Sequence, residues 1–420
     1  MARMILIAIG SHGDVHPMLG IAGKLKQLGH EVIVLTNPYF ESLVQQLGFS
    51  FRPLGTAEEF QTVSDNPAVW RPVSGFKLLA RWGILHTMEP LYQHLEKLYI
   101  PGNTVVAAPI TATGARIAQE KLGLPLATIH LQPAIFRSIY ESPRLPPMLL
   151  GRGVPKWFKK FQFHLADRLL VDPVLAAGTN RFRATLGLTP VRNILDRWCL
   201  SPQRIIGLFP SWFAAPQPDW PAQTLLTGFP LWDEREISKA NHEVEAFLEA
   251  GSPPFVFTPG TAMKHGRDFF RVAIKVSGQL GQRAILLSNH TEQIPRQLPP
   301  GIVHFDYIPF SQILPRCAAL IHHGGIGSTA QALAAGIPQL IMAMAFDQMD
   351  NAARVERLKA GYGLSRRQFR TRRVQTLLAQ LLKSNQMATR PRERSRQRVN
   401  DAALDETATL LEELVGKDQS

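Results

Sequence analysis

Short apolar, β-branched runs alternate with helical patterns along most of this chain. The apolar run at residues 4–10 is followed by a helical pattern at 17–30 and by a second apolar run at 31–37. A glycine stands near the end of each helical pattern, where helices commonly stop. Because strands joined by helices run parallel, this alternation predicts a doubly wound α/β sheet with helices on both faces.

A second alternation of the same kind opens near residue 253, after an irregular, Pro- and Trp-rich region at 133–225. A chain of 420 residues is longer than one hydrophobic core usually serves. We therefore expect two doubly wound, Rossmann-like domains, residues 1–225 and 226–395, which face a central cleft. A helical tail at 396–420 is expected to pack back on the first domain.

The composition is that of an ordinary soluble protein, with 45% hydrophobic and 19% charged residues. No apolar run reaches the roughly 18 residues that a membrane span needs. The chain has only two cysteines, Cys199 and Cys317, which suits a reducing compartment and predicts a cytoplasmic protein.

The net charge of +13 is unevenly distributed, and two segments carry much of it. Residues 366–398 are strongly basic, and residues 154–170 interleave aromatic side chains with lysines. The second segment predicts a helix that could lie peripherally on an anionic membrane surface. The alternative is a solvated basic face over a hydrophobic acceptor pocket. No nucleic-acid-binding motif accompanies the charge, so we expect no nucleic-acid partner.

A glycine-rich turn in the second alternation predicts an anion site. An apolar run ends at His322 and His323, three glycines follow within the next four residues, and a helical pattern opens near Ser328. Glycines allow close backbone approach, and a helix N-terminus presents free N–H groups to negative charge. A diphosphate would suit this turn. The plainer alternative is a tight connection between a strand and a helix.

Three neighbouring elements favour the ligand. Asp347 and Gln348 follow the next strand, where an acid beside an amide can hold adjacent sugar hydroxyls. A second glycine-hydroxyl loop lies at 258–261, and Tyr307 stands at another strand end, where a base could stack. In open parallel sheets these carboxyl ends gather at one edge.

The first glycine-rich turn, residues 10–17, carries His12, Asp14 and His16 between a strand and a helix expected at 17–29. A carboxylate or imidazole there could take a proton from a substrate hydroxyl. Asp14 could instead cap the helix, and the two histidines could be ordinary loop residues. Both interpretations of Asp14 stay open at this point.

In their order, the elements Tyr-x-Pro, HHGGxGS, GIPQ and DQ resemble the donor-binding signature of the family 1 glycosyltransferases, which have the GT-B fold. The resemblance covers nearly the whole chain. Residues 7–17, 67–72, 114–121 and 201–221 are most similar to the rhamnosyltransferases of rhamnolipid synthesis. Bacterial macrolide, sterol and flavonoid glycosyltransferases are also similar.

The resemblance implies an inverting, metal-independent glycosyltransferase. It would move a rhamnose- or glucose-type sugar from dTDP-rhamnose or UDP-glucose to a hydroxyl of a small hydrophobic acceptor, such as a hydroxy-fatty acid, a flavonoid or a sterol. No cofactor other than this nucleotide-sugar co-substrate is implied. Two alternatives are a nucleotide-sugar 2-epimerase of the same fold and a non-catalytic nucleotide- or lipid-binding protein.

Carried over residue by residue, the resemblance assigns the donor. His323 would contact the diphosphate, Tyr307 and Ile308 the base, and Asp347 with Gln348 the sugar. The full set implied is Gly260, Thr261, Tyr307, Ile308, His323, Gly325, Gly327, Ser328, Thr329, Gln331, Asp347 and Gln348.

Two positions depart from the family pattern. Gln331 stands where a ribose-binding glutamate is usual, which makes a deoxyribose donor at least as plausible as a uridine donor. Ala343 stands where a proline is usual, and we have no functional account of it.

The same resemblance places Asp14 at the position of the catalytic base, with His12 as the residue that could act in its place. Phe76, Trp82 and Phe136 would line an apolar acceptor pocket. Core packing is the alternative for these aromatic residues, because large side chains in such regions more often fill a core.

Overall fold

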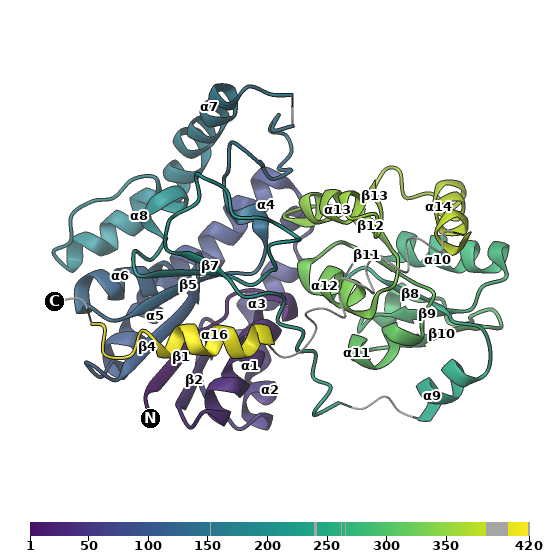
Figure 1. The fold of residues 1–420 in the computed structure, drawn as a ribbon, viewed down its shortest axis with the longest axis horizontal. Coiled ribbons are helices and arrows are strands. Elements are labelled where there is room, and N and C mark those ends of the chain that lie inside the picture. The colour runs from purple at the N-terminus through teal and green to yellow at the C-terminus, as the bar shows by residue number, and fades with distance from the viewer. Residues whose placement is uncertain (152, 239–241, 262, 265, 384–401, 419–420) are drawn as a thin grey trace. The chain divides into compact units, whose positions relative to one another are not determined.

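Figure 1 shows a computed structural model of the chain, which describes residues 1–151, 153–238, 242–261, 263–264, 266–383 and 402–418. The chain divides into two units, Met1–Pro230 with Asp401–Ser420, and Leu231–Asn400. Each unit holds one sheet in which all strands are parallel. The two doubly wound, Rossmann-like domains predicted from the sequence are thus confirmed. Residues 384–401, which include the end of the basic segment 366–398, lie outside the described residues.

The sheet of the first unit has seven strands. They are β1 (Arg3–Ile7), β2 (Glu31–Thr36), β3 (Ser50–Pro53), β4 (Thr104–Pro109), β5 (Leu126–His130), β6 (Arg204–Gly207) and β7 (Thr224–Leu226). Their order is β3-β2-β1-β4-β5-β6-β7, so the direction of winding reverses between β1 and β4. The segments after these two strands therefore flank the switch point, where open sheets bind ligands.

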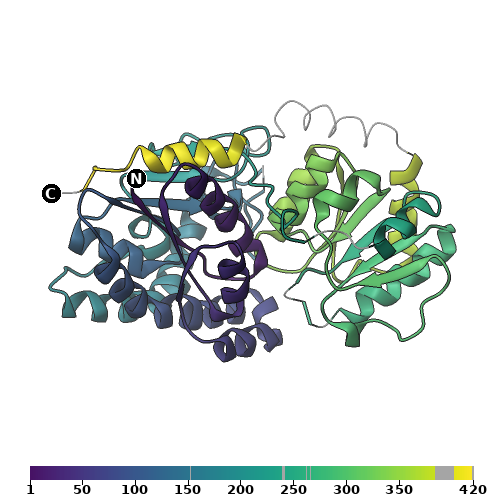
Figure 2. The same ribbon diagram turned by 90° about the horizontal axis from the view of Figure 1, so that it is seen from below.

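Helices of the first unit connect these strands (Figure 2). They are α1 (His12–Gln27), α2 (Glu41–Gln46), α3 (Ala57–Asp65), α4 (Pro72–Leu79), α5 (His86–Leu98), α6 (Thr113–Leu122), α7 (Lys156–Ala166) and α8 (Asp172–Thr185). Short 3-10 turns lie at Pro38–Phe40, Pro67–Trp70 and Pro133–Ile135, and π turns at Ala80–Leu85, Asp167–Val171 and Ile194–Trp198.

Helix α1 begins earlier than the sequence suggested. It opens at His12 after the N-cap Ser11, whereas the expected start was residue 17. Asp14 supplies the reason, because its carboxylate accepts the Ser11 N–H and satisfies a backbone donor before the helix. His12, Asp14 and His16 consequently lie in the first turns of a helix and not in a loop.

Helix α16 (Ala402–Glu412) belongs to the first unit, although it closes the chain. It lies along α1, as Figure 1 shows in yellow. Lys24 pairs with Asp405 at 2.9 Å, and His30 contacts Glu412 at 2.8 Å. The hydroxyls of Thr227 and Thr407 are buried and share a hydrogen bond of 2.8 Å. These contacts hold the last helix on the first sheet domain.

The sheet of the second unit has six strands. They are β8 (Phe255–Thr258), β9 (Ala284–Leu287), β10 (Ile302–Phe305), β11 (Ala319–His322), β12 (Gln339–Ala343) and β13 (Gly361–Ser365). The order β10-β9-β8-β11-β12-β13 places the switch point between β8 and β11. The helices are α9 (His242–Glu249), α10 (Arg267–Leu280), α11 (Phe310–Ile313), α12 (Ile326–Ala335), α13 (Gln348–Arg357) and α14 (Thr371–Lys383), with 3-10 turns at Thr291–Gln293 and Leu314–Arg316.

Both faces of this second sheet are buried. Phe255 and Phe257 of β8 pack in one hydrophobic cluster, and Val256 between them packs in another. Alternate side chains of a strand point to opposite faces, so each cluster lies between the sheet and one layer of helices. This explains why the strands read as continuous apolar runs.

Candidate functional site

The switch point of the second sheet brings together the two glycine-hydroxyl loops that the sequence singled out. His322 is the register partner of Thr258, so the chain leaves β11 and β8 side by side at the same edge. The segment after β8 contains Gly260, and the segment after β11 contains His323. These residues are distant in the chain but adjacent in space.

The imidazole of His323 lies between two glycine backbones. A Cβ added at Gly260 would stand 2.7 Å from Cε1 of the ring, and one added at Gly325 would stand 2.5 Å from Nε2. Both distances are shorter than a side chain tolerates, so only glycine fits on either side. Gly260 also has a φ of +94°, in the left-handed region. The ring is therefore fixed by backbone on two sides.

His323 is neutral in this setting. Burial lowers the pKa of its imidazole from 6.5 to about 4, since a charged ring would lose its hydration. Its Nδ1 is buried and makes no hydrogen bond to any residue that the structure describes. A buried polar atom without a partner is costly, and ligand-binding sites are one place where such atoms occur.

The adjacent His322 has a different, structural environment. Its Nδ1 accepts the Gly324 N–H at 3.1 Å, so the ring proton lies on Nε2, which faces Gln339 Oε1 at 3.0 Å. Gln339 Nε2 in turn donates to the Thr329 carbonyl at 3.3 Å. Burial, followed by the neighbouring His323, lowers the pKa of His322 to about 3. This neutral histidine ties strand β11 to helix α12.

Helix α12 begins directly after His323, with Gly325 as its N-cap. The Thr329 N–H donates to the Gly325 carbonyl at 3.0 Å, which leaves the N–H groups of the preceding three residues without a partner inside the helix. Gly327 is exposed and Ser328 is half-buried, so both can meet a ligand. Thr329 is fully buried. Its side chain therefore faces the interior, unlike the diphosphate contact expected of it.

The loop after β12 holds Asp347 and Gln348 at the start of α13. Asn351 Nδ2 donates to Asp347 Oδ2 at 2.6 Å and also lies 2.9 Å from the Gly324 carbonyl, which links this loop to the turn after β11. Gln348 Oε1 accepts the N–H groups of Met344 and Ala345 at 2.8 and 3.1 Å. The oxygen of Gln348 thus closes the loop, which leaves its amide nitrogen as the group that could reach a sugar.

Tyr307, Ile308 and Gln331 lie on the other side of the second sheet's edge segments. The Tyr307 hydroxyl donates to the Asp233 carbonyl at 2.9 Å, and burial raises the pKa of this phenol. Ile308 is buried in the core, so a base could meet only its backbone. Gln331 is buried, and its Nε2 lies 3.3 Å from the Leu231 carbonyl.

Thr261, the remaining donor residue predicted from the sequence, is exposed in the turn after Gly260. The residue that follows it lies outside the described residues. Nothing in the described part of this turn fixes the Thr261 hydroxyl, and its contact with a phosphate stays a prediction.

In the first unit, Asp14 sits just after β1, at the switch point of that sheet. The Ser11 N–H donates to Asp14 Oδ2 at 2.8 Å, and the Ser11 hydroxyl lies 3.4 Å from the same oxygen. Burial nevertheless raises the pKa of the carboxyl from 3.8 to about 6, because lost hydration outweighs the bonds from Ser11. The capping role is confirmed, and the carboxylate is a stronger base than an ordinary aspartate.

Gly10 makes this arrangement possible. A Cβ at residue 10 would lie 2.1 Å from Asp14 Oδ2, and the φ of Gly10 is +142°. His12 is held by aromatic contacts, with its ring centroid 4.9 Å from Phe40 and 5.4 Å from His16. The three titratable residues of the opening turn are therefore not equivalent: one carboxylate caps the helix, and two imidazoles pack edge to face.

The three predicted acceptor residues differ in their surroundings. Phe136 is 5% exposed and stacks on Trp220 with ring centroids 4.1 Å apart, so it packs in an aromatic cluster as the core alternative describes. Phe76 is half-buried against the hydrophobic core. Trp82 is also half-buried, in the π turn after α4, with its ring 5.5 Å from His86. Phe76 and Trp82 remain candidates for an acceptor surface.

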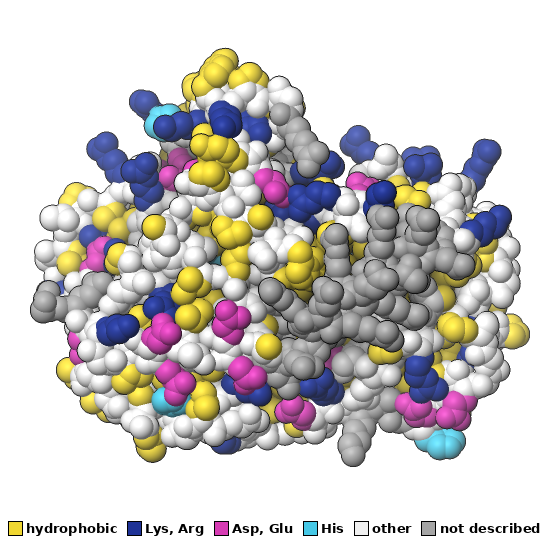
Figure 3. All heavy atoms as spheres, in the orientation of Figure 1, with side chains coloured by type: hydrophobic (Ala, Val, Ile, Leu, Met, Phe, Trp, Pro, Cys, Tyr) yellow, Lys and Arg dark blue, Asp and Glu magenta, His cyan; other side chains and the backbone are white. Residues whose placement is uncertain are grey.

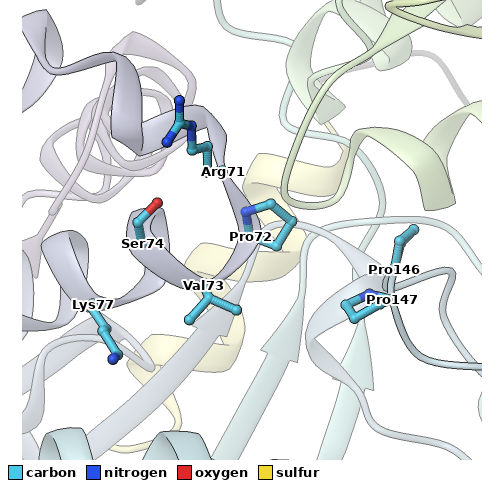
Figure 4. A pocket seen from close by; sticks show the side chains of 7 residues that line it. All are labelled: Arg71, Pro72, Val73, Ser74, Lys77, Pro146 and Pro147. Atoms are coloured by element: carbon cyan, nitrogen blue, oxygen red, sulfur yellow. The ribbon is translucent and has the colours of Figure 1, made fainter.

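Helix α4 also borders a surface pocket of about 580 Å³, which Figure 4 shows. Pro72 and Val73 lie on one side of it and Pro146 with Pro147 on the other. The pocket is completed by Arg71, Ser74 and Lys77. Its walls are mainly apolar, with two basic side chains at the margins.

Among the residues that the structure describes, no three His, Cys, Asp or Glu side chains gather as ligands for a metal ion. Within the same residues, none of the helices combines the length and the apolar character that crossing a membrane requires.

Two residues that the sequence argument passed over organise the site. Asn351 joins Asp347 to the turn after β11, and Asp233 accepts the Ser311 N–H at 2.7 Å while its carbonyl holds Tyr307. The spacing from Asp347 to Asn351 is one helical turn, which could have indicated the first contact. No sequence signal joins Asp233 to residues more than seventy positions away.

Two protein families match this chain. Residues 4–141 match the N-terminal domain of glycosyltransferase family 28, and residues 276–414 match the C-terminal domain of the erythromycin biosynthesis protein CIII-like family. The O-mycaminosyltylonolide 6-deoxyallosyltransferase of Streptomyces fradiae is 28% identical over 368 residues, which cover 85% of this chain and 84% of that protein.

Solved structures resemble the whole chain. The glycotransferase of kitacinnamycin has a TM-score of 0.74 and 18% identity, with 99% of each chain covered. The spinosyn rhamnosyltransferase SpnG complexed with thymidine diphosphate has a TM-score of 0.64 and 17% identity, over 97% of this chain and 100% of that chain. At such identities the likeness establishes the fold, and the family matches and the curated relative carry the function.

Proposed function

The chain belongs to the glycosyltransferases of GT-B fold, and from this premise we propose that it transfers a sugar from a dTDP- or UDP-sugar to a hydroxyl of a hydrophobic acceptor, with inversion and without a metal ion. The observation that carries the proposal is the His323 imidazole, held between Gly260 and Gly325 with a buried, unpartnered Nδ1 among the described residues. This is a prepared hydrogen-bonding group at the N-terminus of a helix.

The donor diphosphate would bind at this turn. The free N–H groups at the start of α12 and the Ser328 hydroxyl supply hydrogen bonds, and the helix dipole adds about 0.3–1 kcal/mol of favourable interaction with negative charge. When the sugar leaves, negative charge builds on the diphosphate, so the same donors stabilise the transition state. His323 adds one more N–H from a ring that cannot move.

The sugar and the base would occupy the flanking segments. The Asp347 carboxylate and the Gln348 amide nitrogen can hold neighbouring hydroxyls, and Tyr307 offers a ring fixed through its hydroxyl. Gln331 is a neutral amide already placed against a carbonyl, which grips a ribose diol less strongly than a carboxylate would. A dTDP donor fits this difference, and SpnG and VinC are related folds whose structures hold thymidine diphosphate and dTDP.

Asp14 would act as the base that removes the proton of the acceptor hydroxyl. A pKa near 6 leaves most of its carboxylate ionised at neutral pH and ready to accept a proton. The oxygen of the deprotonated hydroxyl attacks C1 of the sugar from the face opposite the diphosphate. The C1–O bond to the diphosphate then breaks with its electron pair, which gives an inverted glycoside, a nucleoside diphosphate and a protonated Asp14.

The acceptor would bind to the first unit. Trp82 and Phe76 offer half-buried aromatic surface, and the pocket between α4 and Pro146–Pro147 offers apolar walls with Arg71 and Lys77 at the margin. A hydroxy-fatty acid suits such a lining, because its chain is apolar and its carboxylate is negative.

The test is acceptor-dependent release of nucleoside diphosphate. The purified chain is incubated with dTDP-rhamnose or UDP-glucose, in each case with a β-hydroxy fatty acid, with a flavonoid or alone, in the presence of EDTA. We expect release with one donor only when an acceptor is present, and NMR of the product should show the inverted anomer. An epimerised donor, or binding without turnover of any pair, would contradict transfer.

A further inference from the structure

Helix α7 and the π turn that continues it, Asp167–Val171, carry two parallel rows of exposed side chains. One row is basic and the next is apolar, each with a spacing of four residues. The basic row is Lys156, Lys160, His164 and Arg168, and the apolar row is Trp157, Phe161, Leu165 and Leu169. No acidic residue belongs to either row.

The apolar row is unusually open to solvent. Trp157 is 72% exposed, Phe161 52%, Leu165 40% and Leu169 67%. Large apolar side chains are normally scattered singly on a protein surface. Here four of them follow one another over about 18 Å of helix. A continuous ridge of this kind indicates a surface that meets an apolar partner.

The opposite side of the same helix is firmly packed, so the exposure does not come from a loose segment. Lys159, Phe163, Asp167 and Val171 form a buried row. Asp167 pairs with Arg137, and Lys159 Nζ lies 3.4 Å from the Ile139 carbonyl. The helix is thus anchored through one side while it presents the two exposed rows on the other.

The π turn keeps these rows aligned. In a regular α-helix, residues four apart drift by about 40° around the axis, so a row with this spacing would leave the face within a few turns. A π turn is wider and rotates less per residue, which counteracts the drift. The turn falls at Asp167–Val171, where it brings Arg168 and Leu169 into line with the residues before them.

A second segment extends the surface. Gln162 Oε1 accepts the Leu149 N–H at 2.7 Å, and Gln162 Nε2 donates to the Leu149 carbonyl at 2.8 Å. Leu149, 65% exposed, is thereby held beside the helix. Figure 3 shows hydrophobic and basic side chains next to each other over α7, at the top of the view.

We propose that this face, the two rows of α7 with Leu149, binds the surface of a membrane that contains anionic lipids. Aromatic and aliphatic side chains of the apolar row enter the boundary between headgroups and acyl chains, while the basic row meets lipid phosphates. A bilayer is favoured over a folded partner because the exposed ridge is long, convex and shows the paired apolar and basic rows of an interfacial helix. The surface does not include the proposed donor or base residues.

The experiment measures sedimentation of the full chain with vesicles. Vesicles of equal parts phosphatidylglycerol and phosphatidylcholine are compared with vesicles of phosphatidylcholine alone, at low and high salt. We expect binding to the anionic vesicles, at least tenfold weaker binding to the neutral ones, and a marked loss at high salt. No binding to the anionic vesicles would overturn the proposal.

Paired variants assign the binding to this face. W157S/F161S and K160E/R168E should each reduce binding to anionic vesicles at least tenfold. Their matched controls are L28S/L382S, at leucines that are 54% and 43% exposed elsewhere, and R372E/R373E, in the other basic segment. Controls that lose as much binding, or α7 variants that lose none, contradict the assignment.

Two further readings separate the membrane from other partners. Size-exclusion chromatography of the wild type and of W157S/F161S tests whether the face joins two copies, and a shift of oligomeric state between them would overturn the proposal. Nucleoside diphosphate binding should be equal in the wild type and in W157S/F161S. This equality shows that the variant is folded and keeps the outcome independent of the proposed function.

Discussion

The backbone of Gly260 lies against the imidazole of His323, so close that a Cβ at residue 260 would stand 2.7 Å from the ring. The two residues come from adjacent strands at the switch point of the second sheet. A glycine on one segment therefore sets the position of a histidine on another. The geometry makes a direct prediction about ligand binding.

Gly260→Ala should raise the dissociation constant of the nucleoside diphosphate about tenfold or more, because the methyl group displaces the His323 ring. Isothermal titration calorimetry measures the constant. Gly281→Ala is the matched control, since Gly281 also has a positive φ but has nothing within 4 Å of an added Cβ. Both variants carry similar backbone strain. Equal weakening in the two would mean that contact with His323 is irrelevant.

The adjacent histidines should respond to alanine in opposite ways. His322→Ala leaves the Gly324 N–H and Gln339 Oε1 without partners in the core, and should lower the free energy of unfolding by about 2–4 kcal/mol. His323→Ala removes a ring whose Nδ1 has no partner among the described residues, so we expect a smaller loss of stability. Urea unfolding measures both values.

Ligand binding should show the reverse order. His323→Ala is expected to weaken binding of the nucleoside diphosphate about tenfold, a loss of about 1.4 kcal/mol. Binding by whatever fraction of His322→Ala remains folded should stay close to that of the wild type. A wild-type affinity in His323→Ala would remove this residue from the donor site.

Asp14→Asn should lower kcat by about 10²–10⁴-fold and leave the affinity for the donor unchanged. Asparagine keeps an oxygen that can accept the Ser11 N–H, so the start of helix α1 is retained. Steady-state kinetics with saturating donor give kcat. Activity near that of the wild type would exclude Asp14 as the base and favour His12.

The pH dependence follows from the raised pKa of Asp14. A base must be deprotonated, so kcat/KM of the wild type should fall as the pH drops below about 6. An ordinary aspartate would hold its activity to about pH 4. The residual activity of Asp14→Asn should lack this acidic limb, which separates loss of the base from a general effect of acid on the fold.

The same carboxyl group should reduce the stability of the protein at neutral pH. Folding raises its pKa from 3.8 to about 6, so the folded state binds the proton more tightly than the unfolded state does. The cost is absent below pH 3.8, grows between 3.8 and about 6, and is complete above that. Asp14→Asn should therefore raise Tm at pH 7.5 by about 2–4 °C.

Calorimetry at two pH values checks this prediction. At pH 3.5 the wild type and Asp14→Asn should unfold at the same temperature, because the carboxyl is then protonated in both the folded and the unfolded state. A lower Tm for the variant at pH 7.5 would show that the charge of Asp14 stabilises helix α1 more than burial penalises it.

The alternation of apolar runs and helical patterns was enough to predict two parallel, doubly wound sheets. Such periodicity is local, and the connection rules for parallel strands leave few topologies. The glycines around His323 and the position of Asp14 after the first strand were likewise visible, because glycine and a turn acid have strong local preferences.

Burial and protonation were decided only by the tertiary structure. The sequence placed His322 beside His323, but only the fold couples the first to Gln339 and Thr329 and leaves the second for a ligand. It also gave Thr329 a ligand contact, whereas the fold turns that side chain inward.

The pKa of Asp14 and the two rows of helix α7 have the same origin. Hydrogen bonds from Ser11 are local and lower the pKa, but burial among residues distant in the chain outweighs them. The sequence of α7 shows a helix with aromatic and basic side chains, and only the packing of its inner row decides which of them meet solvent. Periodicity is a property of neighbouring residues, whereas burial sums contacts from the whole domain, so the sequence alone determined the fold class and the tertiary structure determined the roles.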